Sequence, residues 1–259
     1  MARRKRSGLT NDSRVYAYGK CCNHSPIKRK IIRINNIATF FQGNWIVNER
    51  TVILTGQSLM VSVNISLLIN YPFTNNGSIV NNGTIDSITE IINSGVGIIT
   101  NNGTINTLGF SNYDGGIINN SINGTINNPS NCRIHNEGII NNSGTINNSG
   151  VFDNGGTGLI NNTNNSIITN NHTINNVHII NNNSGSVIDN KNGSVINNNG
   201  SAIIYNNSNA TIINNTGATF LNNGIINNAD GTSLCGTGHI NQLSAITGIE
   251  GFGTECPPP

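Results

Sequence analysis

The most regular feature of the chain is an aliphatic residue followed by two asparagines. A typical stretch reads Gly-Ile-Ile-Asn-Asn-Ser-Gly-Thr-Ile-Asn-Asn-Ser-Gly over residues 138–150, and related units recur between about residues 74 and 231 at steps of roughly six, eight or nine residues. Self-similarity at such a short period is typical of solenoids, in which each unit becomes stable only by stacking on the next. The pattern therefore predicts a rod of stacked repeats.

Alternation of apolar and mixed positions within each unit predicts β-strands. The position directly before the asparagine pair is apolar at Val80, Ile118, Ile126, Ile140, Ile146, Ile160, Ile174, Ile180, Ile196, Ile213, Leu221 and Ile226. The preceding position is mixed, as at Thr125 and Arg133, so one side chain is expected to point inward and the next outward. Where Thr100, Thr169 or Tyr205 stands before the asparagine, the isoleucine comes one place earlier. We interpret this as a slip of one residue.

The asparagine pairs are predicted to form the corners between strands. Asparagine tolerates the left-handed backbone region better than other residues with a side chain, so it can turn the chain without strain. Its amide can also donate and accept hydrogen bonds along a ladder from one coil to the next. A ladder of this kind would satisfy polar groups that the bend leaves unpaired.

Three successive steps add up to a coil of roughly 18 to 25 residues. The first asparagine of the pair at one corner is Asn119, Asn141, Asn161, Asn181, Asn206 and Asn227 in successive coils. The predicted fold is all-β, a single-stranded parallel β-helix with three strands per coil and seven or eight coils, about 35 Å long at about 4.8 Å per coil. Uneven steps favour a right-handed winding. The alternative is a left-handed hexapeptide helix, because Ile134, Ile140, Ile146 and Phe152 keep a spacing of six.

Four segments are expected along the chain. Residues 1–33 form a basic flexible arm, residues 34–73 N-terminal cap strands, residues 74–231 the Asn-rich rod, and residues 232–259 a C-terminal cap or tail. About a fifth of the residues are Asn and 9% are charged, a composition that also suits a disordered chain. The regular placement of the aliphatic residues favours an ordered rod.

Charge is concentrated at the N-terminus. Ten of the 13 basic residues and one of the 11 acidic residues lie in the first 33 positions. The formal net charge of this segment is therefore +9, and that of the remainder is −7. Candidate polyanion-binding residues are Arg3, Arg4, Lys5, Arg6, Lys28, Arg29, Lys30 and Arg33. Because Tyr16 and Tyr18 are the only aromatic residues there, any contact with nucleic acid is expected through phosphates, without sequence choice. A solvated tail without a partner is the alternative.

The cysteines and the apolar segments give no sign of a metal site, a secretion signal or a membrane span. Five cysteines occur without CxxC spacing, and Cys235 with Cys256 is the only pairing that closeness in sequence suggests. The basic start is followed by polar residues 7–13 instead of an apolar run. The most apolar segment, residues 52–69, is interrupted by polar side chains and is too polar to span a membrane.

The Gly-Thr-Ile-Asn-Asn and Gly-Ile-Ile-Asn-Asn runs at residues 124–128, 138–142, 144–148 and 224–228 resemble two groups of repeats. They are similar to those of filamentous-haemagglutinin-type β-helical adhesins and, equally, to the Asn-rich repeat proteins of mimivirus-type giant viruses. The resemblance covers about 160 residues. It implies a β-helical fold, and a surface or virion location. Because adhesins need an export signal and a secretion domain that are not found here, the viral, structural interpretation is favoured.

Few side chains suit catalysis. The rod contains Asp86, Glu90, Asp114, Glu137, Asp153, Asp189 and Asp230. Asp153 and Asp189 are expected at different corners, whereas His135 and Asp153 are expected at one corner in successive coils, as polar variants within an asparagine ladder. His172 and His178, candidates for the general base of a hexapeptide acyltransferase, have no acidic partner nearby in sequence and are expected to be exposed strand residues. We therefore predict no catalytic, cofactor or metal site.

One outward row is predicted to be apolar in every coil. It consists of Ile117, Ile139, Leu159, Ile179, Ile204 and Ile225. Since a soluble monomer seldom exposes a continuous apolar patch, this stripe is expected to contact another copy or another structural protein, unless the terminal segments fold over it. The sequence thus favours a non-enzymatic structural rod of a virion or surface assembly. The alternatives are a carbohydrate-binding or carbohydrate-cleaving β-helix and a nucleic-acid-associated protein.

Overall fold

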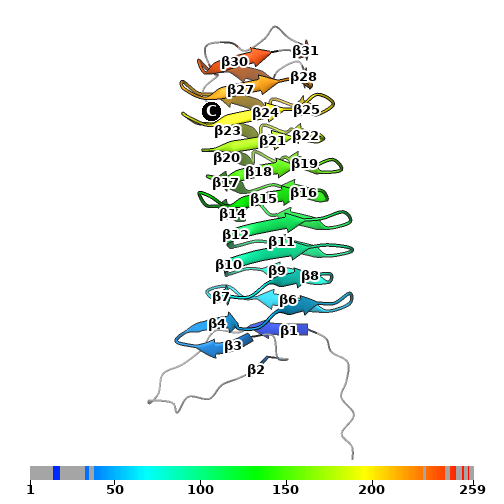
Figure 1. The fold of residues 1–259 in the computed structure, drawn as a ribbon, viewed down its shortest axis with the longest axis vertical. Helices are drawn as coiled ribbons and strands as arrows, with labels where there is room; N and C mark the ends of the chain where they lie inside the picture. Colours follow the sequence, from blue (N-terminus) through cyan, green and yellow to red (C-terminus); the bar gives the residue numbers. More distant parts are fainter. Residues whose placement is uncertain are drawn as a thin grey trace, which may run out of the picture.

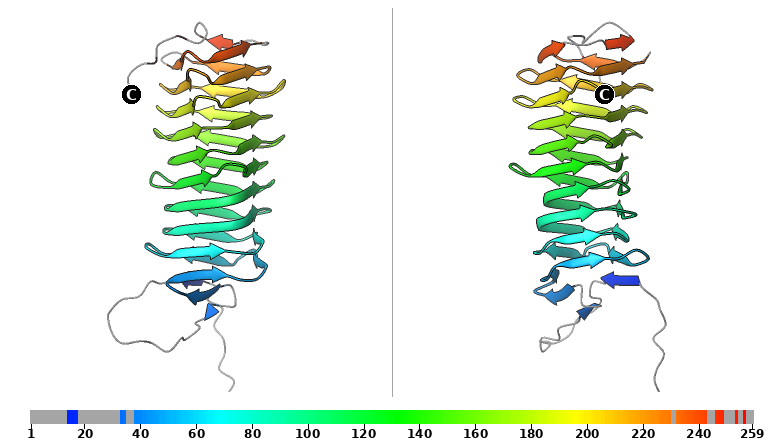
Figure 2. Two further views of the ribbon diagram at one scale, coloured as in Figure 1. Left: turned by 60° about the vertical axis from the view of Figure 1, so that its left-hand side comes forward. Right: turned by 45° about the vertical axis from the view of Figure 1, so that its right-hand side comes forward.

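The computed structural model is a rod of stacked β-strands (Figure 1). It describes residues 14–17, 33–34, 38–229, 232–242, 246–248, 253 and 256. Over these residues the chain consists of strands and connecting turns, with no helix. Successive coils lie one above another along the long axis, as the turned views also show (Figure 2). The predicted all-β parallel solenoid with three strands per coil is confirmed, and the hand of its winding stays a prediction.

Each coil contributes one strand to each of three faces. The first face is a parallel sheet of β1 (Arg14–Ala17), β6 (Ser58–Val61), β9 (Ser78–Asn81), β11 (Ile98–Asn101), β13 (Ile117–Asn120), β16 (Ile139–Asn142), β19 (Leu159–Asn162), β22 (Ile179–Asn182), β25 (Ile203–Asn206), β28 (Ile225–Asn228) and β31 (Ile246–Gly248). Eight of these strands lie within residues 74–231, which agrees with the seven or eight coils expected.

The second and third faces follow in the same order. The second contains β4 (Asn44–Val47), β7 (Ser66–Ile69), the first halves of β10 (Thr84–Asn93) and β12 (Thr104–Asn112), β14 (Thr125–Asn128), β17 (Thr145–Asn148), β20 (Ile167–Asn170), β23 (Val187–Asn190), β26 (Thr211–Asn214) and β29 (Ser233–Cys235). The third contains β5 (Thr51–Ile53), β8 (Phe73–Asn75), the second halves of β10 and β12, β15 (Arg133–Asn136), β18 (Val151–Asn154), β21 (Thr173–Asn176), β24 (Val195–Asn198), β27 (Thr219–Asn222) and β30 (His239–Gln242).

The register corrects the predicted slip. Thr100 pairs with Asn119, and Tyr205 pairs with Asn181, so these coils stack without displacement. The regular strand has four residues whose second and fourth side chains are buried, and the fourth is usually Asn. The inward aliphatic residue therefore lies two places before the buried asparagine. For the same reason Val80, Ile213 and Leu221, predicted to point inward, point outward, and Ile79, Ile212 and Phe220 occupy the interior.

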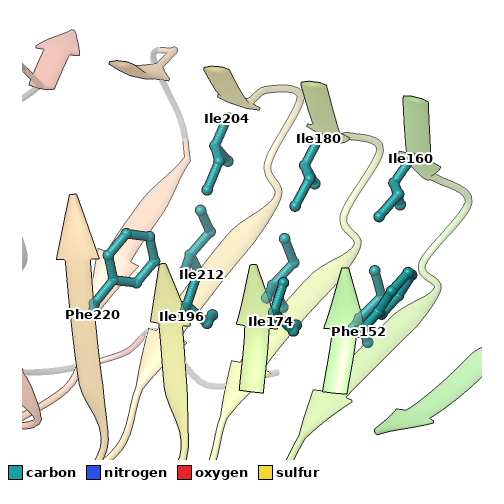
Figure 3. Close-up of a pocket in the computed structure, with 10 residues that line it drawn as sticks. Phe152, Ile160, Ile174, Ile180, Ile196, Ile204, Ile212 and Phe220 are labelled. Carbon is teal, nitrogen blue, oxygen red and sulfur yellow. The ribbon is translucent and has the colours of Figure 1, made fainter. Parts of the chain in front are cut away.

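Isoleucine from all three faces fills the interior. In Figure 3, Ile160, Ile180 and Ile204 point from the first face toward Ile174 and Ile196, which come from the third. Each of these side chains is at most 2% exposed. The cavity between them is about 10 Å³, no more than the space that one water molecule needs. The axis of the rod is thus a packed apolar column that has no room for a ligand.

Buried asparagines form ladders at the corners, as predicted. Along the first face each asparagine from Asn81 to Asn206 donates an amide proton to the next asparagine at 2.7–2.8 Å. A second amide hydrogen bond joins the coil above, for example from Asn148 Nδ2 to the Thr173 carbonyl at 2.8 Å. The predicted left-handed backbone at these corners is wrong. Among described residues with side chains it occurs in turns such as Asn131 and Asn164, because the ladder asparagines end extended strands.

Both ends of the rod differ from its middle. At the N-terminal end β2 (Arg33–Ile34) and β3 (Ala38–Phe41) pair antiparallel, and β3 pairs antiparallel with β4. The coil of β6, β7 and β8 already stacks in parallel on β9 and β10, so regular winding extends into the predicted cap of residues 34–73. Strand β1, within the predicted flexible arm, pairs with β6. At the C-terminal end Cys235 and Cys256 form a disulfide, which confirms the expected pairing.

Candidate functional site

The predicted apolar stripe runs along the first face. Ile98, Ile117, Ile139, Leu159 and Ile179 are in register on successive strands, and each side chain points outward. The upper end of the row corrects the prediction: Ile203 and not Ile204 continues it to Ile225, because Ile204 is 1% exposed in the core. The sequence interpretation had assumed a slip at Tyr205. The corrected row remains aliphatic from β11 to β28.

A polar row lies directly beside this stripe. Asn141 donates to Asn119, Asn161 to Asn141, and Asn181 to Asn161, at 2.8–2.9 Å. The amides of this outer ladder point toward the N-terminal coils, opposite to the buried ladders. The first face thus combines a continuous apolar row and a row of amides already paired with one another. Such a surface can approach another flat surface without leaving many polar groups unpaired.

Of the eight predicted polyanion-binding residues, the structure describes Arg33 alone. Arg3, Arg4, Lys5, Arg6, Lys28, Arg29 and Lys30 lie outside the described residues. Arg33 lies in β2, next to the antiparallel strands at the N-terminal end of the rod. The basic segment therefore precedes the first coils directly in the chain.

The carboxylates of the rod mostly act as acceptors for neighbouring groups. Asp86 accepts from Asn106 at 2.7 Å, and Asp153 accepts from Asn175 at 2.6 Å, so each ends an outer ladder on its N-terminal side. Asp189 accepts from Asn215 and forms an ion pair with Lys191. Asp153 lies on the third face and Asp189 on the second, as predicted. These contacts fit a role as variants within the ladders.

His135 and Asp153 are in register on successive strands, also as predicted. The Arg133 guanidinium contacts Asp153 at 2.5 Å and His135 Nδ1 at 3.2 Å, and His135 Nε2 lies 3.2 Å from Glu137. His172 and His178 lie in the turns after β20 and β21, so the expected strand placement is wrong for both. Nothing in the sequence pattern had linked Arg133 and Glu137 to His135.

A recess of about 410 Å³ beside this cluster was missed by the sequence analysis. It is lined by Ile88, Thr89, Glu90, Leu108, Gly109, Ser111, Tyr113, Arg133 and His135. The signal that could have revealed it is an interruption of the repeat: β10 and β12 pass the corner between the second and third faces without an asparagine pair, and their register shifts there. The recess brings a carboxylate, a guanidinium and an imidazole together, from Glu90, Arg133 and His135.

Neither a metal centre nor a membrane-spanning helix is found in the part of the chain that the structure describes. Within it, no three His, Cys, Asp or Glu side chains are arranged to hold a metal ion. No helix of sufficient length and hydrophobicity to cross a membrane occurs among the same residues.

Comparison of the chain with protein-family models, curated proteins and solved structures found no match. The structure itself shows an Asn-rich β-helix repeat. The finer resemblance to giant-virus proteins or to haemagglutinin-type adhesins stays a prediction.

Proposed function

We propose that the protein is a non-enzymatic structural rod of a virion or surface assembly, docked through its basic N-terminal arm. The observation that supports this proposal is the continuity of the stack. Buried asparagine ladders run through the first-face and third-face corners from β8 and β9 to β27 and β28, with a packed apolar interior between them. A chain that repeats one coil in this way has a long, uniform surface, which suits assembly better than catalysis.

The stripe on the first face is the proposed contact with a second copy of the chain. A parallel sheet with an apolar row along its length can pack against the same row of another rod that is turned about a two-fold axis. Ile98 and Ile225, at the two ends of the stripe, are 39% and 41% exposed. Burying such a row removes apolar surface from water at about 25 cal/mol per Å², which favours association.

Replacing Ile139, Leu159 and Ile179 together by Thr should reduce self-association in sedimentation without changing the circular dichroism spectrum. Threonine keeps the β-branched shape that strands favour but removes apolar surface. A matched control replaces Ile167, Val187 and Val195, outward residues of the other two faces, by Thr. The control should associate like the wild type. A monomeric wild type, or equal association of both variants, would contradict the interface.

The basic arm is proposed to hold the rod on an acidic surface. Contacts between lysine or arginine and phosphate release counterions, so binding to a polyanion such as duplex DNA or heparin should weaken steeply with added salt. Deleting residues 1–13 and replacing Lys28, Arg29 and Lys30 by Gln removes most of the basic arm but keeps strand β1, and should lower the affinity and flatten the salt dependence. Binding that ignores salt, or that survives these changes unaltered, would remove the arm from the docking mechanism.

The second candidate function is carbohydrate binding. The recess between β10, β12 and β15 favours it, because it places the polar groups of Glu90, Arg133 and His135 beside exposed apolar side chains. A location on a cell surface would suit this function as well as a virion.

A further inference from the structure

The recess on the third face exists because one outward side chain is missing. Glu90, Gly109 and Arg133 occupy the same outward position on successive strands β10, β12 and β15. A Cβ atom added at Gly109 would lie 3.4 Å from both Cα and Cβ of Glu90, and no left-handed backbone requires glycine there. Glycine therefore leaves open the space that a β-branched residue such as Val151 fills one coil above Arg133.

The walls of the recess combine apolar and hydrogen-bonding groups. Ile88 and Leu108 stand at the corner where β10 and β12 turn, and are 64% and 50% exposed. Tyr113 is 38% exposed, and its ring forms an edge-to-face pair with the His135 ring, with the two centroids 6.0 Å apart. Exposed apolar side chains around a concave polar surface are typical of ligand sites, and the volume falls within the usual range of about 300–1,000 Å³.

The polar groups are held in place by hydrogen bonds and ion pairs. Ser111 donates to the Glu90 carboxylate from the neighbouring strand. Arg133 is fixed by Asp153 at 2.5 Å, while its side chain stays 60% exposed. His135 is 19% exposed between Arg133 and Glu137. Because these contacts fix the side chains before any ligand arrives, binding would cost little ordering of the site.

The charges around the recess indicate the kind of ligand. Glu90 and Arg133 line the recess, and two further carboxylates lie beside it, Asp153 paired with Arg133 and Glu137 paired with His135. The surplus of negative charge disfavours phosphate, sulfate and carboxylate ligands. A neutral polyhydroxylated ring fits, since its hydroxyls can donate to Glu90 and accept from Arg133, and its C–H face can pack on Tyr113, Ile88 and Leu108.

We propose that this recess binds a neutral sugar unit of a glycan chain. The proposal rests on the second candidate function and specifies its ligand, and it does not depend on the structural role, because the stripe and the arm lie elsewhere on the chain. The open shape of the recess suits one unit of a longer chain that continues along the surface of the rod.

The test measures binding of the full chain to an array of glucose, galactose and N-acetylglucosamine oligosaccharides, together with uronate-containing and sulfated ones. A neutral oligosaccharide that binds is then titrated calorimetrically against variants. Gly109→Val should fill the recess and weaken binding by at least about tenfold, that is about 1.4 kcal/mol. Gly200→Val, at a turn with open space around its Cβ, is the matched control and should bind like the wild type. Equal melting temperatures for all three proteins would show that the fold is unchanged.

Several outcomes overturn the proposal. They are a failure of every neutral oligosaccharide to bind, equal affinity of the wild type and the Gly109→Val variant, and a preference for the uronate or sulfated oligosaccharides. A parallel array of basic peptides tests an alternative ligand, since the surplus of carboxylates in and beside the recess would also attract positive charge. A clear preference for these peptides over neutral sugars would assign the recess to a protein partner instead.

Discussion

Each buried asparagine of the first face from Asn81 to Asn206 donates to the asparagine of the next coil and to a backbone carbonyl of that coil. The sequence predicted this ladder but did not distinguish the two asparagines of a pair, because their chemistry is identical. The printed sequence does hold a signal. The first position varies, as in Thr100, His135 and Asp153, whereas the position after it is Asn in each case. The less variable position is the buried one, where Asn supplies both bonds at the corner.

Replacing Asn148 by Ala should destabilise the protein much more than replacing Asn147. Asn148 is fully buried, accepts from Asn128 at 2.6 Å and donates to Asn170 at 2.8 Å. Its loss leaves buried polar groups unpaired, at about 1–3 kcal/mol for each. Asn147 ends an outer ladder, so replacing it by Ala should lower the free energy of unfolding by no more than about 1.5 kcal/mol. Urea denaturation followed by circular dichroism checks the difference, and equal losses would contradict the ladder's role.

At the scale of the strand and its corner, glycine determines how closely coils can stack. A Cβ atom at Gly144 would lie 2.2 Å from the Gly124 carbonyl oxygen and 2.3 Å from that of Ser121. Both acceptors belong to the backbone of the coil below and cannot move aside alone. This contact could not be predicted from the sequence, because it joins residues about 20 positions apart. The recess was missed for a similar reason: the outward Gly109 matters only beside Glu90 and Arg133.

The change Gly144→Ala should therefore destabilise the stack, by about 1–3 kcal/mol, as expected for overpacking. Hydrogen exchange should become faster in β14 and β17, which adjoin this corner, and change little in β26 and β27. Gly200→Ala, where nothing lies within 4 Å of the added Cβ atom, is the control and should stay within about 0.5 kcal/mol of the wild type. Equal stability of the two variants would contradict the conclusion that the close approach of the coils at position 144 requires glycine.

At the scale of the whole molecule, alternation and coil length predicted the architecture well. The first residues of successive first-face strands from β9 to β28 are separated by 19 to 24 residues, within the expected 18 to 25. The sequence did not predict where the regular coils begin at the N-terminal end. The buried last residues of β6 and β7 are Val61 and Ile69 instead of asparagine. Aliphatic residues fill these first corners, so the asparagine signal begins later than the coils do.

A rod in which each coil contacts only its neighbours depends on every inward residue near its centre. Ile146 is 1% exposed and stacks between Ile126 and Ile168, whereas its neighbour Thr145 points outward. Comparing the urea denaturation of Ile146→Asp and Thr145→Asp is the most direct test of this architecture. The Ile146→Asp variant buries an unpaired charge, so its free energy of unfolding should fall by several kcal/mol. That of Thr145→Asp should fall little, because its charge faces solvent. Equal stability of Ile146→Asp and the wild type would contradict the packed, three-sided solenoid.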